Sequence, residues 1–192
     1  MTTRAATKTR LTLDEFLAQQ ETKPASEYAC GEVTQKPMPT QAHSILRFYL
    51  GMLLNPFLSR LGPGRALPEW RCIFGPPGHE RAIVPDLTVV LKDRMPSGDA
   101  RDTPYLRTAP DLAIEILSPG QSIRTFVEKI LFYLLHGVRL IWIVDAEAEI
   151  VLVLRPGEES TELGVGDQLD GGDVLPGFNL DVGELFAQLR GS

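Results

Sequence analysis

The chain has 192 residues, of which 43% are hydrophobic and 23% are charged, and this is an ordinary globular composition. Its length fits a single domain with a sizeable core, and no apolar run approaches the length of a membrane span. The formal net charge of −6 argues against a surface that binds polyanions over its whole extent. This net charge does not exclude an enzyme that acts on nucleic acid, because a site built from carboxylates and a metal is itself acidic and a basic patch can be local.

The domain is expected to span residues 11–190, after a flexible N-terminus at residues 1–10. These first residues are basic and polar, and they lack the apolar segment of a secretory signal. The two cysteines, Cys30 and Cys72, do not have CxxC spacing. We therefore expect reduced thiols in a cytoplasmic protein.

The N-terminal part of the chain predicts a short helix followed by a pair of strands. Thr12 is the expected cap of a helix over residues 12–20, because Glu15 stands three positions further on. Residues 27–36 are typical of a strand pair or of one strand bent at Gly31.

Residues 41–59 predict a long helix that Pro56 either kinks or ends at Asn55. Its apolar residues recur at helical spacing, so we expect one buried stripe along the helix. The residues assigned to that stripe are Ile45, Phe48, Tyr49, Met52 and Leu53.

Two strands are expected next, at residues 71–74 and 82–91, and Pro85 marks an irregular point in the second of them. Residues 92–108 are polar and rich in Arg, Asp, Gly and Pro, which predicts a loop or a mobile flap.

The centre of the chain is predicted to be a strand, a helix and a second strand. The strand at residues 111–117 ends at a Ser-Pro-Gly breaker, and residues 122–136 contain no Gly or Pro. Gly137 ends the helix, and residues 139–145 are again strand formers. Such a unit makes the two strands parallel and largely buried.

A further strand is expected at residues 148–155, then a glycine-rich polar loop and a short closing helix at residues 182–189. Strands on both sides of a crossover helix indicate the α/β class. The predicted architecture is a mixed β-sheet flanked by helices, with additional strands at the N- and C-terminal ends.

Charged residues within this apolar centre require an explanation. Because side chains alternate along a strand, Asp111, Ala113, Glu115 and Leu117 are expected on one face and the intervening residues on the other. On the helix, Lys129 has Phe126, Phe132 and Tyr133 three or four positions away. A lysine that merely extends its ammonium to a nearby carboxylate explains this pattern as well as a catalytic lysine does.

Asp86, Glu115, Lys129 and Glu27 are the candidate site residues, because each stands in or beside an apolar run. If the strands of Asp86 and Glu115 pair, two carboxylates converge and repel one another unless a cation lies between them. Mg²⁺ is bound through one or two carboxylates together with phosphate oxygens of a substrate, and Mn²⁺ can take its place. A lysine beside such a pair completes the arrangement that phosphodiester hydrolysis needs.

Several motifs occur in a specific order over nearly the whole chain, from Leu11 to Leu189. They are Glu27-Tyr-Ala-Cys-Gly-Glu32, His43, Pro85-Asp86, Ala109-Pro110-Asp111-Leu112, Glu115-Ile-Leu-Ser118-Pro119, Glu128-Lys129, Tyr133, Gly137-Val138, Trp142-Ile-Val-Asp145 and Gly171-Gly-Asp-Val-Leu-Pro-Gly-Phe178. This series resembles the bacterial family of putative restriction endonucleases with the PD-(D/E)xK nuclease fold. Any one of these motifs alone would be weak.

The resemblance implies a role for each candidate residue. Asp86 corresponds to the Asp of the PD motif and Glu115 to the acidic residue of the second motif, with the backbone carbonyl of Ile116 as a further metal ligand. The position two residues after Glu115 holds Leu117, where the wider superfamily has its lysine, and Lys129 on the helix takes that role here. Glu27 corresponds to the N-terminal acidic residue, which would support a second metal ion or its water.

The same resemblance implies a Mg²⁺-dependent endonuclease that acts on DNA, with homodimers expected because cutting both strands needs two sites. DNA would lie over residues 92–107, where Lys92, Arg94, Arg101 and Arg107 can meet phosphates. The alternative is a non-catalytic or regulatory nucleic-acid-binding module that retains the nuclease fold. The acidic charge and the displaced lysine favour that alternative, and the set of Asp86, Glu115 and Lys129 argues against it.

Other polar residues are expected to be structural. Asp111 at a strand entrance and Asp145 at a strand end are interpreted as turn or capping groups, and Trp142 as core. His43 is interpreted as a packed or hydrogen-bonded residue rather than a ligand. Three histidines without paired spacing do not indicate zinc, and the Walker, GxGxxG and GxSxG motifs are absent.

Overall fold

The predicted strand–helix–strand unit lies at the centre of the structure, a computed structural model that describes residues 10–62, 64–121 and 123–190. It consists of β7 (Leu112–Ile116), α3 (Ile123–Leu135) and β8 (Leu140–Asp145). The two strands are parallel and in register from Leu112 opposite Leu140 to Ile116 opposite Val144, as expected. The expected flexible N-terminus at 1–10 lies, except for residue 10, outside the described residues.

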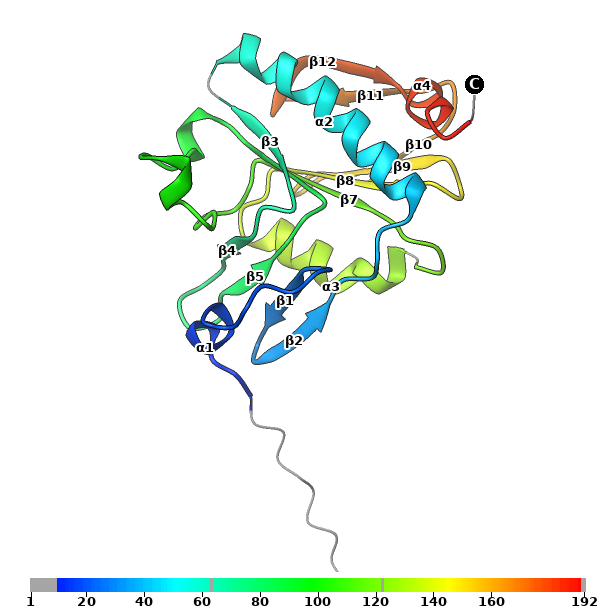
Figure 1. The fold of residues 1–192 in the computed structure, drawn as a ribbon. Coiled ribbons are helices and arrows are strands. Elements are labelled where there is room, and N and C mark those ends of the chain that lie inside the picture. Colours follow the sequence, from blue (N-terminus) through cyan, green and yellow to red (C-terminus); the bar gives the residue numbers. More distant parts are fainter. Residues whose placement is uncertain (1–9, 63, 122, 191–192) are drawn as a thin grey trace, which may run out of the picture.

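This unit belongs to a mixed six-stranded sheet of order β10-β9-β8-β7-β6-β3, in which β7 and β8 form the parallel pair (Figure 1). The other strands pair antiparallel with their neighbours. Their bounds are Arg65–Pro68 for β3, Leu87–Val90 for β6, Ile150–Leu154 for β9 and Thr161–Leu163 for β10.

A four-stranded sheet of order β2-β1-β5-β4 lies next to it and contains the predicted strand pair. Its strands are β1 (Ser26–Ala29), β2 (Glu32–Gln35), β4 (Cys72–Phe74) and β5 (Arg81–Ile83). Cys30 and Gly31, with φ of 50° and 87°, form the two-residue turn of the β1–β2 hairpin. The strand predicted at residues 82–91 is divided into β5 and β6 at Pro85 and Asp86, so the irregular point is confirmed.

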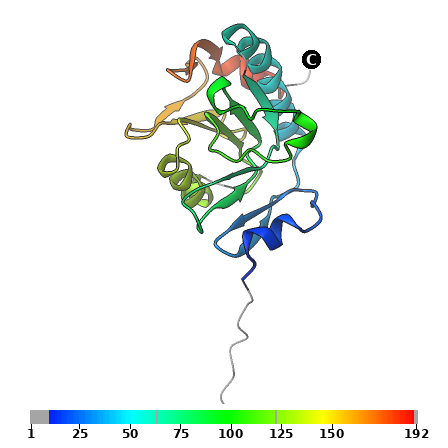
Figure 2. The same ribbon diagram turned by 90° about the vertical axis from the view of Figure 1, so that its left-hand side faces the viewer.

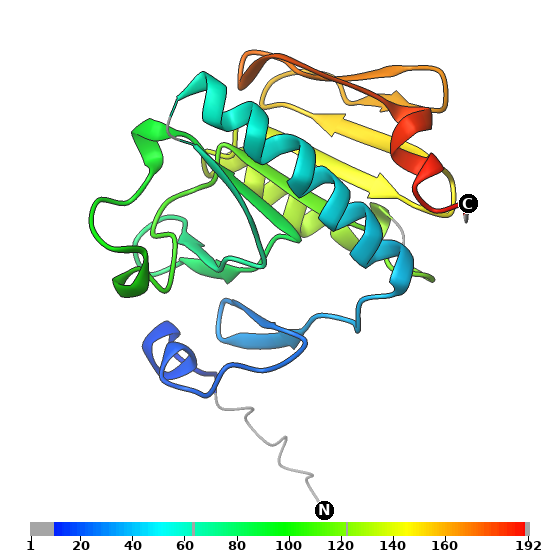
Figure 3. The same cartoon turned by 45° about the horizontal axis from the view of Figure 1, so that its top comes forward.

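The helices cover the six-stranded sheet on both faces. Helix α2 (Gln41–Leu61) crosses one face with α4 (Val182–Ala187) and the strands β11 (Gln168–Gly171) and β12 (Leu175–Asp181) beside it (Figures 1 and 3). Helix α3 packs on the opposite face. Short helix α1 (Leu13–Leu17) packs against β1, and 3-10 turns at Lys92–Arg94 and Ala100–Asp102 lie in the predicted loop. None of the described helices is both long enough and apolar enough to cross a membrane.

The two faces of β7 have the predicted composition. Leu112, Ile114 and Ile116 belong to the core beneath α2, whereas Ala113 and Leu117 belong to the core beneath α3. Glu115 therefore faces α3. Figure 2 shows the β1–β2 hairpin and α1 at the end of the molecule away from the C-terminal strands, so the hairpin lies on the α3 side.

The expectations for α2 and for the glycine-rich loop are wrong in part. Phe48 and Met52 of the predicted stripe are 73% and 49% exposed. The buried residues of α2 are His43, Leu46, Tyr49, Leu50, Leu54 and Leu58. The helix is apolar on most sides, so periodicity alone could not select its buried face. Of the two alternatives for Pro56, an end of the helix at Asn55 is wrong, because α2 continues to Leu61. The short strands β10 and β11 lie where a glycine-rich polar loop was expected.

Gly171 offers a test of this packing, since a β-carbon there would lie 2.3 Å from Cβ of Leu175 and 2.6 Å from its carbonyl oxygen. We expect Gly171→Ala to lower the free energy of unfolding by about 1–3 kcal/mol, because the β11–β12 backbone must shift to make room. Urea denaturation measures this change. Gly164→Ala is the matched control, because the nearest atom to its β-carbon is 4.0 Å away. An equal loss in both variants would contradict the packing seen at Gly171.

Candidate active site

A cavity of about 360 Å³ lies between the β1–β2 hairpin, the corner at Pro85 and Asp86, the end of β7 and helix α3. Its wall is strongly charged. The acidic residues of the wall are Glu27, Glu32, Glu69, Asp86, Glu115 and Glu128, and the basic ones are Lys36, Arg81 and Lys129. With six acidic and three basic side chains the wall carries a formal charge of −3, which favours a bound cation.

Asp86 lies at the corner between β5 and β6, and both oxygens of its carboxylate have polar partners. One carboxylate oxygen, Oδ1, accepts a hydrogen bond of 2.5 Å from the Lys36 ammonium. The other, Oδ2, accepts one of 2.7 Å from the backbone N–H of Ile116 and lies 3.1 Å from Nε2 of His43. Because a residue in an extended strand directs its N–H and C=O to the same side, the Ile116 carbonyl is expected on the Asp86 side too.

Glu115 is 1% exposed, in the middle of an otherwise aliphatic strand. Its Oε1 accepts hydrogen bonds from the Tyr133 hydroxyl at 2.6 Å and from the Lys129 ammonium at 2.7 Å. These two donors are four residues apart on α3, so they lie on the same face of the helix. Its Oε2 has no hydrogen-bond partner among the described residues and lies 4.0 Å from the Lys36 ammonium.

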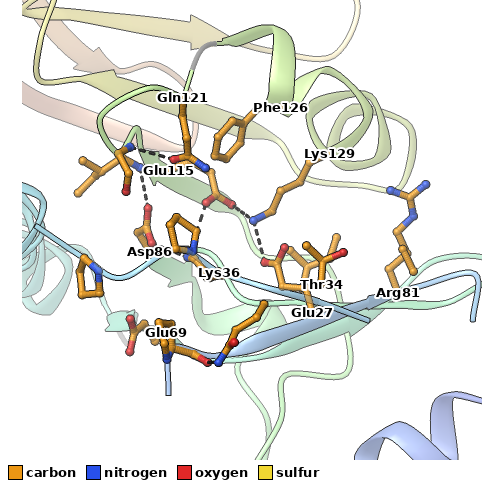
Figure 4. A pocket seen from close by; sticks show the side chains of 18 of the residues that line it. Glu27, Thr34, Lys36, Glu69, Arg81, Asp86, Glu115, Gln121, Phe126 and Lys129 are labelled. Carbon is orange, nitrogen blue, oxygen red and sulfur yellow. Dashed lines mark hydrogen bonds and ion pairs between the residues drawn. The ribbon is translucent and has the colours of Figure 1, made fainter. Parts of the chain in front are cut away.

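Glu27 reaches the same cavity from β1. Side chains alternate along that strand, so Tyr28 stacks on Phe16 of α1 and Glu27 points the other way. Its Oε1 accepts from the Lys129 ammonium and from the backbone N–H of Val84, both at 2.8 Å. Lys129 therefore bridges Glu27 and Glu115, as Figure 4 shows.

The surroundings of Lys129 agree in part with the sequence prediction. Its ammonium lies 5.8 Å from the ring centre of Phe126 and 5.9 Å from that of Tyr133. Phe132 points elsewhere, where the guanidinium of Arg81 lies over its ring. Leu117, at the position where the wider superfamily carries lysine, is buried in the core beneath α3. The ammonium near Glu115 thus comes from the helix.

Two residues of the cluster were not recognised from the sequence as site residues. Lys36, directly after β2, was not singled out, because an exposed lysine at the end of a strand is common. His43 was interpreted as packed or hydrogen-bonded, and it is both, buried at the start of α2 with Nε2 on Asp86. The short Lys-Pro-Met-Pro segment that joins the hairpin to α2 was the available signal, since it ties both residues to one place.

The charges in the cavity shift one another's pKa. Burial alone would raise the pKa of Asp86, but the Lys36 ammonium and the hydrogen bond from His43 outweigh it and lower that pKa below 3.8. Burial raises the pKa of Glu115 above 4.5 despite Lys129 and Lys36. Burial would lower the pKa of Lys129, but the carboxylates of Glu115 and Glu27 outweigh it and raise that pKa above 10.5. Lys129 therefore stays charged at neutral pH.

The four basic residues proposed to contact DNA do not line this cavity. Arg94 donates hydrogen bonds to the carbonyls of Ala109, Pro110 and Gly137 and lies 3.4 Å from Asp111. Arg101 forms an exposed ion pair with Asp99. Lys92 is exposed in the first 3-10 turn, and Arg107 is exposed beside His136 and Gly137 in a different hollow. Arg94 thus serves the fold, and DNA contact by the other three remains a prediction.

The residues interpreted as structural are structural. Asp111 is buried and accepts hydrogen bonds from the backbone N–H of Leu91 and from Arg139. Asp145 accepts from two backbone N–H groups of the turn that follows β8. Trp142 is fully buried in the core beneath α2. Cys30 and Cys72 are free thiols.

The described residues contain no group of three or more His, Cys, Asp or Glu side chains that could enclose a metal ion. Mg²⁺ does not need such a group, because it is commonly bound through one or two carboxylates with water and substrate phosphates. Asp86 and Glu115 fit this pattern. A cation would give a partner to the buried Oε2 of Glu115, which has none in the described part of the chain, and would balance the negative charge of the cavity wall.

A mixed sheet between helices, with two carboxylates and a lysine converging beside its parallel pair, is the arrangement that the nuclease resemblance implies. Residues 13–183 match Uma2, a family described as putative restriction endonuclease. The chain therefore belongs to the Uma2 family. It is also similar to the crystal structure of a putative nuclease belonging to DUF820 from Anabaena variabilis ATCC 29413, with 34% identity and a TM-score of 0.84. That match covers 94% of this chain and 99% of the other. No curated protein matches the chain.

The opposite pKa shifts predict opposite effects of two similar substitutions. A lowered pKa means that the Asp86 carboxylate stabilises the fold above pH 3.8 and that this contribution is lost as the pH falls below that value. A raised pKa means that ionised Glu115 costs stability, increasingly as the pH rises above 4.5. At pH 7 we expect Asp86→Asn to lower the free energy of unfolding by about 1–3 kcal/mol and Glu115→Gln to leave it unchanged or raise it. Urea denaturation of both variants decides, and equal losses would contradict the assignment.

Arg94 and Arg101 provide a test that separates a structural role from DNA contact. We expect Arg94→Met to lower the free energy of unfolding by about 1–3 kcal/mol, because three backbone carbonyls and Asp111 lose a donor. Arg101→Met removes only an exposed ion pair, so the change should stay within about 0.5 kcal/mol. Thermal and urea denaturation measure both. A stable Arg94→Met protein would return Arg94 to the candidates for DNA binding.

Proposed function

We propose that the protein is a Mg²⁺-dependent endonuclease that hydrolyses phosphodiester bonds of DNA and that also accepts Mn²⁺. The observation that supports it most directly is the bridging position of Lys129, which lies 2.7 Å from Glu115 and 2.8 Å from Glu27 beside the Asp86 corner. Four separate segments, namely β1, the corner between β5 and β6, β7 and α3, bring these charges into one cavity. A domain that served only as a scaffold would be more stable with apolar residues at such buried positions.

Asp86 and Glu115 would hold the cation, with the Ile116 carbonyl as a further oxygen ligand. When bound, a hard divalent cation acidifies a water for attack on phosphorus and stabilises charge on the phosphate oxygens. The chain prepares this position by fixing Asp86 through the Ile116 N–H and His43. Tyr133, whose pKa is raised above 10.0 by burial and by Glu115, remains a hydrogen-bond donor that orients the Glu115 carboxylate.

Lys129 would supply the positive charge that the transition state requires. Its ammonium stays protonated at neutral pH and lies over the rings of Phe126 and Tyr133, 5.8 Å and 5.9 Å from their centres. We assign to Glu27 the orientation of this ammonium, since the same oxygen also accepts from Val84 N–H and so fixes the carboxylate. In the same site, Glu27 would also support a second metal ion or its water.

A phosphate entering the cavity would meet Arg81 as well, whose guanidinium lies 4.5 Å from the ring centre of Phe132 at the cavity wall. Exposed basic residues such as Lys92 and Arg107 would extend the contact with the DNA backbone. Cleavage of both strands of a duplex requires two such sites, so we propose a homodimer as the active form.

Loss of the Lys129 charge tests the proposal. We expect the native protein with Mg²⁺ or Mn²⁺ to cleave at least one member of a panel of plasmid, single-stranded and branched DNA. Lys129→Met keeps the volume of the stem, so the fold should survive while cleavage falls by about a hundredfold or more. Gel electrophoresis of the timed reactions gives the rates.

Two further variants show whether a loss of cleavage is specific to residues of the cavity. Asp86→Asn should be inactive. Arg190→Met, which removes an exposed arginine that pairs with Glu149 outside the cavity, should cleave at the native rate. Cleavage at the native rate by Lys129→Met would remove this lysine from the site. A native protein that binds the panel and cleaves none of it in either metal would favour a non-catalytic binding module instead.

A further inference from the structure

The ammonium of Lys36 lies among three oxygen atoms. It is 2.5 Å from Oδ1 of Asp86, 2.8 Å from the carbonyl oxygen of Val84 and 4.0 Å from Oε2 of Glu115. Two carboxylates and a backbone carbonyl are the ligands that a hard divalent cation prefers. The position between Asp86 and Glu115, where the sequence predicts a shared metal ion, therefore holds the cation of a lysine side chain.

The two lysines of the cavity divide the oxygens of Glu115 between them. Lys129 takes Oε1 together with Glu27, whereas Lys36 faces Oε2 together with Asp86 (Figure 4). The contact of Lys36 with Oε2 is too long for a hydrogen bond, and this oxygen has no hydrogen-bond partner within residues 10–62, 64–121 and 123–190 as described. The Lys36 ammonium thus balances the charge of the two carboxylates but does not contact Oε2 of Glu115 directly. A smaller ion of higher charge between the carboxylates would both balance their charge and contact this oxygen.

Lys36 is fixed at its backbone, but its side chain is more exposed than the side chains of Asp86 and Glu115. Its backbone N–H donates to the carbonyl of Ala25 at 2.9 Å, so the main chain is fixed at the end of the hairpin. The side chain is 15% exposed, against 3% for Asp86 and 1% for Glu115, so it reaches them from the open side of the cavity. A flexible four-carbon stem can withdraw by rotation while the carboxylates stay in place.

We propose that Lys36 occupies the divalent-cation position of the site and that the metal ion binds by displacing its ammonium. This inference rests on the proposed function, because it takes Asp86 and Glu115 as the metal-binding pair. Lys36 is then a resident counter-ion, which keeps two buried carboxylates compensated when no metal is bound. The consequence is that each metal ion competes with a tethered cation and binds more weakly than the two carboxylates alone would allow.

The test is a calorimetric titration with Mn²⁺, and separately Mg²⁺, in the absence of DNA. Lys36→Met keeps most of the stem and removes the competing charge, so we expect it to bind Mn²⁺ about tenfold more tightly than the native protein. Lys129→Met is the matched control, because it removes the same charge from the same cavity without freeing Asp86. A general effect of charge would tighten both variants equally, whereas displacement requires the clearly larger gain for Lys36→Met.

A structural readout accompanies the titration. In crystals of the native protein soaked with Mn²⁺, the anomalous signal should lie between Asp86 and Glu115 with the Lys36 ammonium withdrawn from Asp86. Mn²⁺ bound there while Lys36 keeps its contact with Asp86 would overturn the inference. Lys36→Gln repeats the titration if the Met variant is less soluble or less stable, which circular dichroism and urea denaturation show.

The outcomes separate this inference from the proposed function. If the native protein binds Mn²⁺ and Lys36→Met binds it no more tightly, displacement is wrong while the proposed metal-dependent activity stands. If only Lys36→Met binds Mn²⁺, Lys36 occupies the cation position but the metal ion does not displace it, so both the displacement and the metal dependence of the native protein fail. If neither protein binds Mn²⁺ or Mg²⁺, both the displacement and the metal dependence of the proposed function fail.

Discussion

The burial of the Glu115 carboxylate in an aliphatic strand is the constraint on which the arrangement of the site depends. Burying an ionised carboxylate costs several kcal/mol unless hydrogen bonds and opposite charges surround it. Helix α3 supplies Tyr133 and Lys129 at one oxygen, and the hairpin end brings Lys36 toward the other. The pKa of Glu115 is nevertheless raised by burial, so this compensation is incomplete. The fold is therefore less stable than it would be with an apolar side chain of similar volume at this position.

The same charges attach the β1–β2 hairpin to the rest of the molecule. Strand β2 is exposed throughout, and β1 pairs with β5 through Tyr28 and Ala82. Glu27 and Lys36, one from each end of the hairpin, make the polar contacts that reach across the cavity to α3, the Val84 backbone and the Asp86 corner. Changes in charge at the site are therefore expected to alter how firmly the hairpin is held, which links the chemistry of the cavity to access into it.

The position of the lysine follows from packing on the α3 side of the sheet. Leu117 lies on the face of β7 that packs against α3, within an apolar core with Ile130 and Tyr133. An ammonium at that position would be buried among these side chains, which is costly without a partner. Lys129, one turn before Tyr133 on the helix, reaches Glu115 along aromatic rings instead. The helix thus brings the charge to the same carboxylate from above the sheet.

Patterns within short segments of the sequence predicted the parallel unit of β7, α3 and β8, the two faces of β7 and the break at Pro85. They also predicted the candidate site residues Asp86, Glu115, Lys129 and Glu27. These features follow from side-chain alternation, helical spacing and the cost of burying charge, which are properties of short segments. Only the tertiary structure decided the buried face of α2, the structural role of Arg94, and the presence of Lys36 and His43 beside Asp86. Those facts depend on which distant segments come together, because a lysine after a strand or an arginine in a loop acquires its role from a partner tens of residues away.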